Sequence, residues 1–158
     1  MHIYVDADAC PVKSEVFRVA DRYSLQVTLV ANQPMRVPEN NRISLQIVDD
    51  SLDAADQWIV EQVEPDDIVI TADVPLAAQC LKKQAYAIGN TGKRFTDLNI
   101  GTTLATRDLM ADLRGAGALG GGPPPMTKRD RSRFLQTLDE VIQAIRRSRS
   151  SNELRDGL

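Results

Sequence analysis

Histidine and cysteine are scarce in this chain of 158 residues, with one histidine, His2, and two cysteines, Cys10 and Cys80. The cysteines lie far apart and in no spacing typical of metal ligands. These shortages argue against a zinc site and against a histidine-based catalytic triad. The simplest interpretation of the two cysteines is a pair of reduced thiols in a reducing compartment.

Aromatic residues and long apolar runs are also scarce. Only 4% of the residues are aromatic, so the core has to be built from Val, Ile, Leu and Ala. No apolar run is long enough to cross a bilayer, and the N-terminal segment lacks the basic start and apolar centre of a signal peptide. We therefore expect a cytoplasmic protein with no membrane partner. The 42% hydrophobic content argues against wholesale disorder.

Charge is distributed unevenly around the net value of −3. Residues 128–158 contain eight Lys or Arg and five Asp or Glu, a balance of +3, which leaves −6 for residues 1–127. An acidic body with a basic C-terminal segment is compatible with a metal-dependent site beside a nucleic-acid contact. An ordinary solvated C-terminal helix is the alternative explanation of the same charges.

Short apolar strands alternate with helices along the chain. The patterns predict strands at 2–6, 26–31, 43–48, 68–70 and 85–90, and helices at 11–23, 51–64 and 75–84, with a fourth ending near 114 and a fifth over 128–147. This alternation predicts one three-layer α/β domain over residues 1–147, with a mostly parallel sheet of about five strands and helices on both faces. Residues 148–158 are polar, and we expect them to form a flexible C-terminal tail.

Aspartates follow two of the predicted strands. Asp6 and Asp8 come at the end of the first strand in "YVDADACPVK", and Asp73 follows the fourth strand in "VITADVP". In open α/β sheets, ligands bind outside the carboxyl ends of the strands. Asp73 could instead cap the helix that Pro75 opens.

Two more aspartates lie on the predicted helix 51–64. A helical wheel that starts at Leu52 places Asp56 inside the apolar arc and Asp53 at its edge. A carboxylate directed toward a core needs a partner or a metal ion. The alternative is helix capping or a favourable first-turn charge, and it suits Asp53 better than Asp56.

Converging carboxylates favour hard divalent cations, so the sequence predicts a Mg²⁺ or Mn²⁺ site. Such ions support phosphoryl transfer without a histidine base.

Five motifs resemble the YaiI/YqxD family of uncharacterised bacterial proteins: "VDADACPVK", "DAAD", "VITADVPLA", "NI…L…R" and "GGGPPPMTKRDRSRF". The resemblance extends to about Arg147 and implies a PIN-like fold, whose characterised members are often metal-dependent ribonucleases. It implies acidic roles for Asp6, for Asp53 or Asp56, and for Asp73. Asp8 is an additional metal-ligand candidate, and Asp97 or Asp108 could supply a fourth acid.

A basic segment follows the glycine–proline stretch at 120–125. Lys128, Arg129, Arg131 and Arg133 open the last predicted helix, where the helix dipole disfavours positive charge. A nucleic-acid phosphate could compensate, and a solvent-facing turn that Asp130 partly neutralises is the alternative.

Three further basic features accompany this segment. Lys13 and Arg107 complete the predicted nucleic-acid-binding set, although Arg107 could simply pair with Asp108. Lys93 and Arg94 precede Phe95, which could stack a base but more simply belongs to the core.

These observations predict a divalent-metal-dependent nuclease that hydrolyses RNA. Its catalytic residues would be Asp6, Asp53, Asp56 and Asp73, and its metal ligands these four with Asp8. One alternative is a haloacid-dehalogenase-like phosphatase with Asp6 as nucleophile, because "DADAC" resembles its Asp-x-Asp motif. The other is a non-catalytic RNA-binding regulatory module. The sequence does not specify the oligomeric state.

Overall fold

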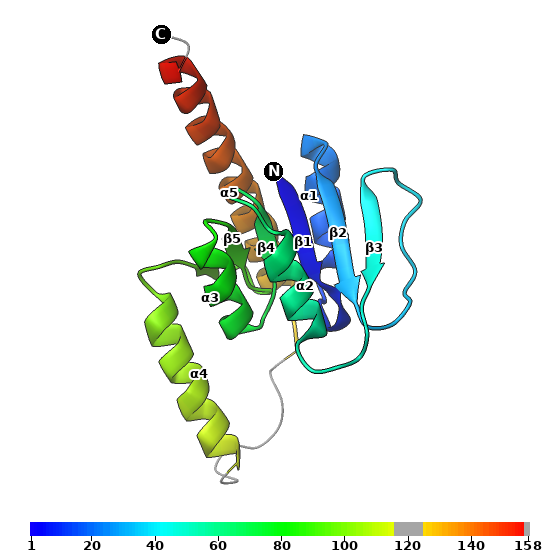
Figure 1. Cartoon of the computed structure of the whole chain (residues 1–158), viewed down its shortest axis with the longest axis vertical. Helices are drawn as coiled ribbons and strands as arrows, with labels where there is room; N and C mark the ends of the chain where they lie inside the picture. The colour runs from blue at the N-terminus through cyan, green and yellow to red at the C-terminus, as the bar shows by residue number, and fades with distance from the viewer. Residues whose placement is uncertain (116–124, 157–158) are drawn as a thin grey trace.

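A six-stranded sheet runs through the centre of the molecule (Figure 1). The computed structural model describes residues 1–115 and 125–156. The strands follow the spatial order β3-β2-β1-β4-β5-β6; the first five are parallel and β6 pairs antiparallel with β5. Their bounds are β1 (His2–Asp6), β2 (Gln26–Ala31), β3 (Ile43–Ile47), β4 (Ile68–Ile70), β5 (Tyr86–Ile88) and β6 (Arg94–Phe95).

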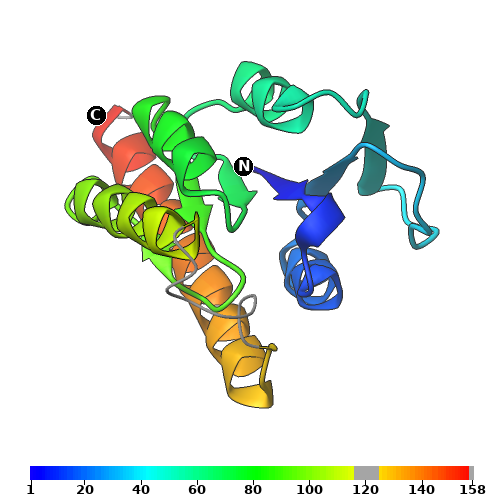
Figure 2. The ribbon, with the colours of Figure 1, turned by 90° about the horizontal axis from the view of Figure 1, so that it is seen from below.

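Helices cover both faces of this sheet, as the view along the strands shows (Figure 2). On one face, α1 (Lys13–Tyr23) packs beside α5 (Lys128–Asp156). On the other, α2 (Ala54–Gln62) lies beside α3 (Val74–Lys82), and α4 (Ile100–Gly115) packs against α3 from outside. The predicted three-layer α/β domain with a mostly parallel sheet is confirmed.

Aliphatic side chains build the core on both faces of the sheet. Between the sheet and the α1/α5 layer, Val16 and Val19 of α1 pack in one buried cluster with Phe134, Leu138 and other apolar residues of α5. Beneath α2 and α3 the buried cluster contains Ile59, Val63, Leu76 and Cys80. Both cysteines are free and buried, in agreement with the expected reduced thiols.

The strand order reverses direction at β1. The chain first adds β2 and β3 on one side of β1, and then β4, β5 and β6 on the other. Val5 of β1 is therefore flanked by Leu29 of β2 and Ile70 of β4. The crevice at such a reversal is where open α/β sheets bind ligands. Here it lies at the carboxyl ends of β1 and β4, directly before two of the predicted site residues.

Three features of the fold differ most from the sequence prediction. The second helix begins at Ala54 instead of residue 51, so Leu52 lies outside it and is 90% exposed. The sixth strand, β6, has only two residues and no apolar run to mark it. The last helix continues to Asp156, through most of the segment predicted as a tail. No helix within the described ranges has the length and apolarity needed to cross a membrane.

Candidate functional site

A hydrogen-bonded chain links the carboxyl ends of β1 and β4. The Thr71 hydroxyl donates to Oδ2 of Asp6 over 2.9 Å, and the backbone N–H of Asp73 donates to the Thr71 hydroxyl over 2.9 Å. Thr71 is only 1% exposed. This buried hydroxyl fixes Asp6 relative to Asp73, a role that the sequence reasoning missed. The signal was present in "VITAD", where a hydroxyl follows a buried strand two positions before an acid.

Asp6 occupies an environment that disfavours its charge. Burial raises the pKa of the Asp6 carboxyl; the Thr71 hydrogen bond opposes this rise, and the charges of Asp73 and Asp8 add to it. Desolvation combined with neighbouring like charges is characteristic of sites that bind a cation or act on a proton.

Asp73 is both a helix cap and a member of the acidic group. Its Oδ1 accepts a hydrogen bond of 3.0 Å from the backbone N–H of Leu76, so Asp73 caps α3, as the alternative interpretation of this residue proposed. Its carboxyl also contacts that of Asp56 on α2 through a hydrogen bond. The cap fixes this carboxylate on a rigid element, which is the arrangement that a preorganised site requires.

Asp56 is the most strongly perturbed carboxyl of the group. Burial is the largest cause, followed by the charges of Asp73, Asp6 and Asp53, and the hydrogen bond to Asp73 adds to them; together they raise the pKa of Asp56 to about 6. The side chain is half-buried on the first turn of α2. Three separate elements thus bring Asp6, Asp56 and Asp73 within mutual electrostatic influence.

Asp53 stands at the rim of this group. It precedes α2 with a left-handed backbone (φ 68°), and its exposed side chain makes no capping hydrogen bond. The structure thus gives no support to the capping role considered for Asp53. A positive φ at a non-glycine residue is uncommon and costs about 1 kcal/mol or more, although aspartate tolerates it better than most residues. Such a conformation often marks a functional position.

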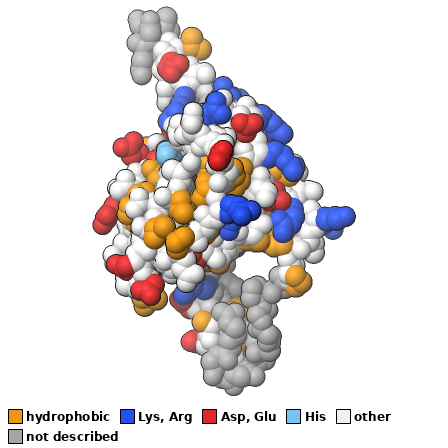
Figure 3. Space-filling model, turned by 90° about the vertical axis from the view of Figure 1, so that its right-hand side faces the viewer, with side chains coloured by type: hydrophobic (Ala, Val, Ile, Leu, Met, Phe, Trp, Pro, Cys, Tyr) orange, Lys and Arg blue, Asp and Glu red, His pale blue; other side chains and the backbone are white. Residues whose placement is uncertain are grey.

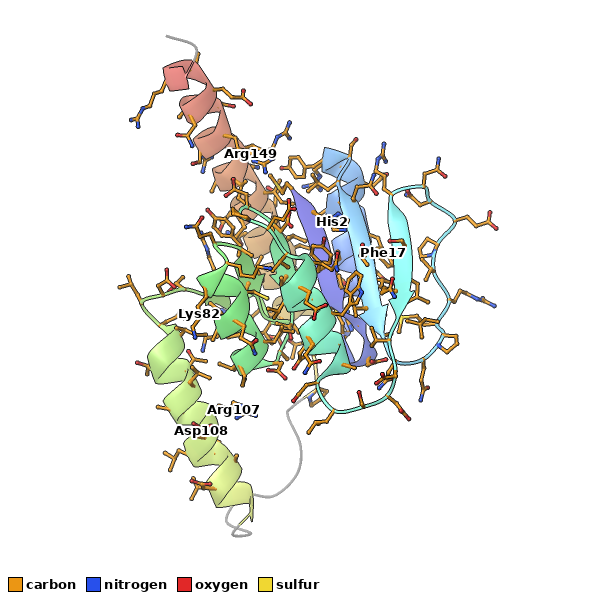
Figure 4. The ribbon with its side chains drawn as sticks, in the orientation of Figure 1. His2, Phe17, Lys82, Arg107, Asp108 and Arg149 are labelled. Atoms are coloured by element: carbon orange, nitrogen blue, oxygen red, sulfur yellow. The ribbon has the colours of Figure 1, made fainter. Side chains whose placement is uncertain are left out.

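A pocket of about 370 Å³ opens beside these acids. It brings Arg107 of α4 to Asp53, Asp56 and Asp73, and Gln57, Pro75 and Gln79 complete its lining. Arg107 also pairs with its neighbour Asp108 over 3.1 Å, as the sequence had suggested (Figure 4). This ion pair is exposed and therefore weak, so it leaves the guanidinium available for an anionic ligand.

Asp8, Asp97 and Asp108 take other positions. Oδ2 of Asp8 accepts a 2.9 Å hydrogen bond from the backbone N–H of Asn32 after β2. Asp8 acts on the acidic group through its charge, which raises the pKa of Asp6. Asp97 lines a different pocket beside β6. Asp108 pairs with Arg107 and does not line the acidic pocket. We define the acidic cluster as Asp53, Asp56 and Asp73, which line the pocket, together with Asp6, whose charge acts on Asp56 and which lies beside Asp73 through Thr71.

The acidic cluster fits a hard divalent cation in charge and donor type. Its oxygen ligands are those that Mg²⁺ and Mn²⁺ prefer, and a cation would relieve the repulsion that raises the pKa of Asp56. Across residues 1–115 and 125–156, no three acid, histidine or cysteine side chains are already gathered closely enough to hold a metal ion. Binding would therefore require these carboxylates to draw together.

Two of the predicted nucleic-acid contacts are engaged within the domain. The Lys13 ammonium donates to the carbonyl oxygens of Ala7 and Cys10, each over 3.1 Å, and so braces the turn after β1. Arg131 donates to the Pro11 carbonyl over 2.7 Å and to the largely buried carboxylate of Glu15 over 3.2 Å. Both side chains hold local structure around the segment 7–15.

The remaining basic residues at the start of α5 face solvent. Lys128, Arg129 and Arg133 are exposed, while Thr127 and Asp130 cap the helix reciprocally through two hydrogen bonds of 3.1 Å. The Arg131 contacts place this start beside the turn after β1, at the same edge of the sheet as the acidic cluster (Figure 2). The glycines at 120–122 lie outside the described residues, and Phe95 is buried, as its core interpretation predicted.

Comparison with known proteins gives a consistent family and no activity. The model of an uncharacterised bacterial family, YaiI/YqxD, matches residues 4–144. A UPF0178 protein of Rhodospirillum rubrum is 56% identical over 94% of this chain and 100% of its own length. UPF0178 proteins of Rhodopseudomonas palustris and Azorhizobium caulinodans are 54% and 51% identical, covering 94% and 92% of both chains in each pair. No solved structure matches, so the PIN-like assignment stays a prediction.

Proposed function

The chain belongs to the uncharacterised YaiI/YqxD family, and we propose that it is a divalent-metal-dependent nuclease that hydrolyses phosphodiester bonds in RNA. One observation carries this proposal: Asp53, Asp56 and Asp73 meet Arg107 in a single pocket, and Asp6 is linked to Asp73 beside it, at the strand-order reversal. Carboxylates suit a metal ion, and a guanidinium suits the phosphate on which that ion would act. RNA is favoured over DNA by the resemblance to PIN-like ribonucleases.

The acidic cluster, Thr71 and Arg107 each have a role in this proposal. Asp6, Asp56 and Asp73 would hold Mg²⁺ or Mn²⁺, and Asp53 would complete the acidic rim. When bound, the cation would stabilise charge on the phosphate and lower the pKa of an attacking water. Thr71 orients Asp6, and the cap at α3 orients Asp73. Arg107 would bind a phosphate oxygen and orient the diester.

The position of Asp8 favours a nuclease over the phosphatase alternative. A haloacid-dehalogenase-like mechanism would need the second acid of "DADAC" close to the reacting group. Here Asp8 is exposed, its carboxylate accepts a hydrogen bond from the Asn32 amide, and it does not line the pocket. The non-catalytic alternative shares the same pocket and differs in turnover, which the following assay measures.

We expect the purified chain to cleave a labelled single-stranded RNA of about 20 nucleotides in Mn²⁺ or Mg²⁺, and to leave it intact in EDTA. Cleavage should require the metal ion because the pocket lining provides carboxylate oxygens that could hold a divalent cation and contains no histidine that could act as a base. Asp6→Asn protein, purified identically, controls for contaminating ribonuclease. RNA binding without cleavage would indicate the binding module, and metal-dependent hydrolysis of phosphomonoesters alone would indicate the phosphatase; either result contradicts the proposal.

A further inference from the structure

A second pocket, which is cationic, lies at the other end of the sheet from the acidic cluster. It has a volume of about 330 Å³ and is lined by Met1, Tyr23, Leu25, Arg146, Arg149 and Ser150. Met1 precedes β1 and Leu25 precedes β2, so this pocket opens at the amino ends of the strands. Figure 4 shows the separation: Arg149 lies on α5 in the upper part of the view, whereas Arg107 lies on α4 in the lower part. We call it the amino-end pocket.

A preorganised side-chain network supports the amino-end pocket. The Arg146 guanidinium lies over the Tyr23 ring, 5.3 Å from its centroid. The Tyr23 hydroxyl donates to Oδ1 of Asp139 over 2.5 Å, and Gln143 donates to both Tyr23 and Asp139. Arg22 of α1 completes the network by pairing with Asp139 over 3.2 Å. Because hydrogen bonds hold the Tyr23 ring in place, the Arg146 guanidinium that stacks on it keeps its N–H edge available for a phosphate.

Positive charge prevails in the amino-end pocket. Arg149 pairs with Asp66 over 3.3 Å, but both side chains are over 40% exposed, so the pair is weak and exchangeable. Within the described residues, Arg146 takes part in no ion pair. The face of the molecule seen from beyond β3 carries most of its Lys and Arg toward one side, with acidic side chains among them and along the other side (Figure 3).

The helix α5 connects this pocket to the edge that holds the acidic cluster. Lys128 and Arg146 are 18 residues apart on one helix, which corresponds to about 27 Å at 1.5 Å per residue. The exposed stripe of α5 between these two residues carries Arg129, Arg133, Gln136, Glu140 and Gln143. Glu140 is the one acidic residue of this set, and the other four side chains can donate hydrogen bonds. A strand lying along this stripe would meet basic residues at both ends.

We propose that the amino-end pocket binds a backbone phosphate of a single-stranded RNA whose other end occupies the acidic site. This inference rests on the proposed nuclease function and adds an extended substrate lying along α5. A stacked strand rises about 3.4 Å per nucleotide, so the length of α5 alone takes about eight nucleotides, and a strand that continues to the acidic pocket on the other face of the sheet must be longer. Shorter strands reach one end of α5 only, and longer strands reach both.

The test is RNA binding as a function of length, measured by fluorescence anisotropy in EDTA. For the parent we expect affinity to rise between a 4-mer and a 16-mer, with a step above eight nucleotides. The double variant Arg146→Ala/Arg149→Ala should bind the 16-mer about tenfold more weakly, with the 4-mer unchanged. Loss of two phosphate contacts should also flatten the plot of log affinity against log salt by about 1.4.

A matched control removes the same charge elsewhere. Lys82→Ala/Arg94→Ala lowers the net charge equally at the opposite side of the sheet and should keep the length step. Arg146→Lys/Arg149→Lys should restore the salt slope, because lysine keeps the charge. Circular dichroism checks that all variants are folded, as expected for exposed positions.

Three outcomes would overturn the inference. The first is the same dependence of affinity on RNA length in the parent and in the Arg146→Ala/Arg149→Ala variant. The second is an equal loss of 16-mer affinity in the Lys82→Ala/Arg94→Ala control. The third is displacement of the 16-mer by a mononucleotide without any length step, which would make the pocket a nucleotide site. Metal-dependent cleavage without a length step would sink this inference alone. A length step without cleavage would instead remove the nuclease proposal and leave strand binding.

Discussion

Asp6→Asn should lower metal-dependent RNA hydrolysis by about 100-fold or more while the domain stays folded. Asp6 is the acid at the strand-order reversal, held by Thr71 and influenced by the charge of Asp73. Even residues that only support a metal ligand typically change affinity or activity 10- to 100-fold, so loss of a ligand should reach at least the upper end. The fold should tolerate asparagine, because its side-chain oxygen can still accept the Thr71 hydrogen bond.

The measurement is turnover of the labelled RNA in Mn²⁺, together with Mn²⁺ affinity by isothermal titration. Asp50→Asn is the matched control, since Asp50 is an exposed aspartate in the loop before α2. We expect the control to resemble the parent in both measurements. A folded Asp6→Asn protein with parental Mn²⁺ affinity and turnover would remove Asp6 from the site.

Asp56→Asn should stabilise the metal-free protein at pH 7 by about 1 kcal/mol, after allowance for solvent screening of a half-exposed group. The folded-state pKa of Asp56 is raised from 3.8 to about 6. Folded protein therefore retains a proton that unfolded protein releases, and the parent loses stability as pH rises from about 4 to 6. Asparagine has no such titration, and it can still donate a hydrogen bond to Asp73.

Thermal melts in EDTA across pH 4 to 7 test the sign of this effect. The variant should melt about 2–4 °C above the parent at pH 7, and the difference should vanish near pH 4. Added Mn²⁺ should stabilise the parent more than the variant, because a ligand has been lost. A variant that is less stable than the parent in EDTA, with an undiminished Mn²⁺ shift, would assign Asp56 to a structural role.

The sequence predicted the layers and the edge of the sheet at which the acids gather. Alternating strand and helix patterns suffice for this, because parallel strands bring their carboxyl ends to one edge. Asp6 and Asp73 could be assigned to that edge from strand ends alone. Asp56 could be directed inward from helical periodicity, although the wheel began at Leu52, which lies outside the helix.

Other features of the site depend on tertiary contacts that no local pattern encodes. Arg107 reaches the acids because α4 packs outside α3. Arg131 and Lys13 turn inward to carbonyl oxygens that lie beside them only in the folded chain. Charge and spacing alone could not distinguish Arg131 and Lys13, which hold local structure, from Lys128, which is exposed.

The most direct test of the metal site is a crystal of the parent protein soaked in Mn²⁺, with data collected to locate anomalous scattering. The proposed function predicts an anomalous peak bounded by the carboxylates of Asp6, Asp56 and Asp73, beside the pocket that Arg107 lines. A fully soaked crystal without a peak at these carboxylates, or with Mn²⁺ bound only elsewhere, would contradict the assignment of the acidic cluster as a metal site.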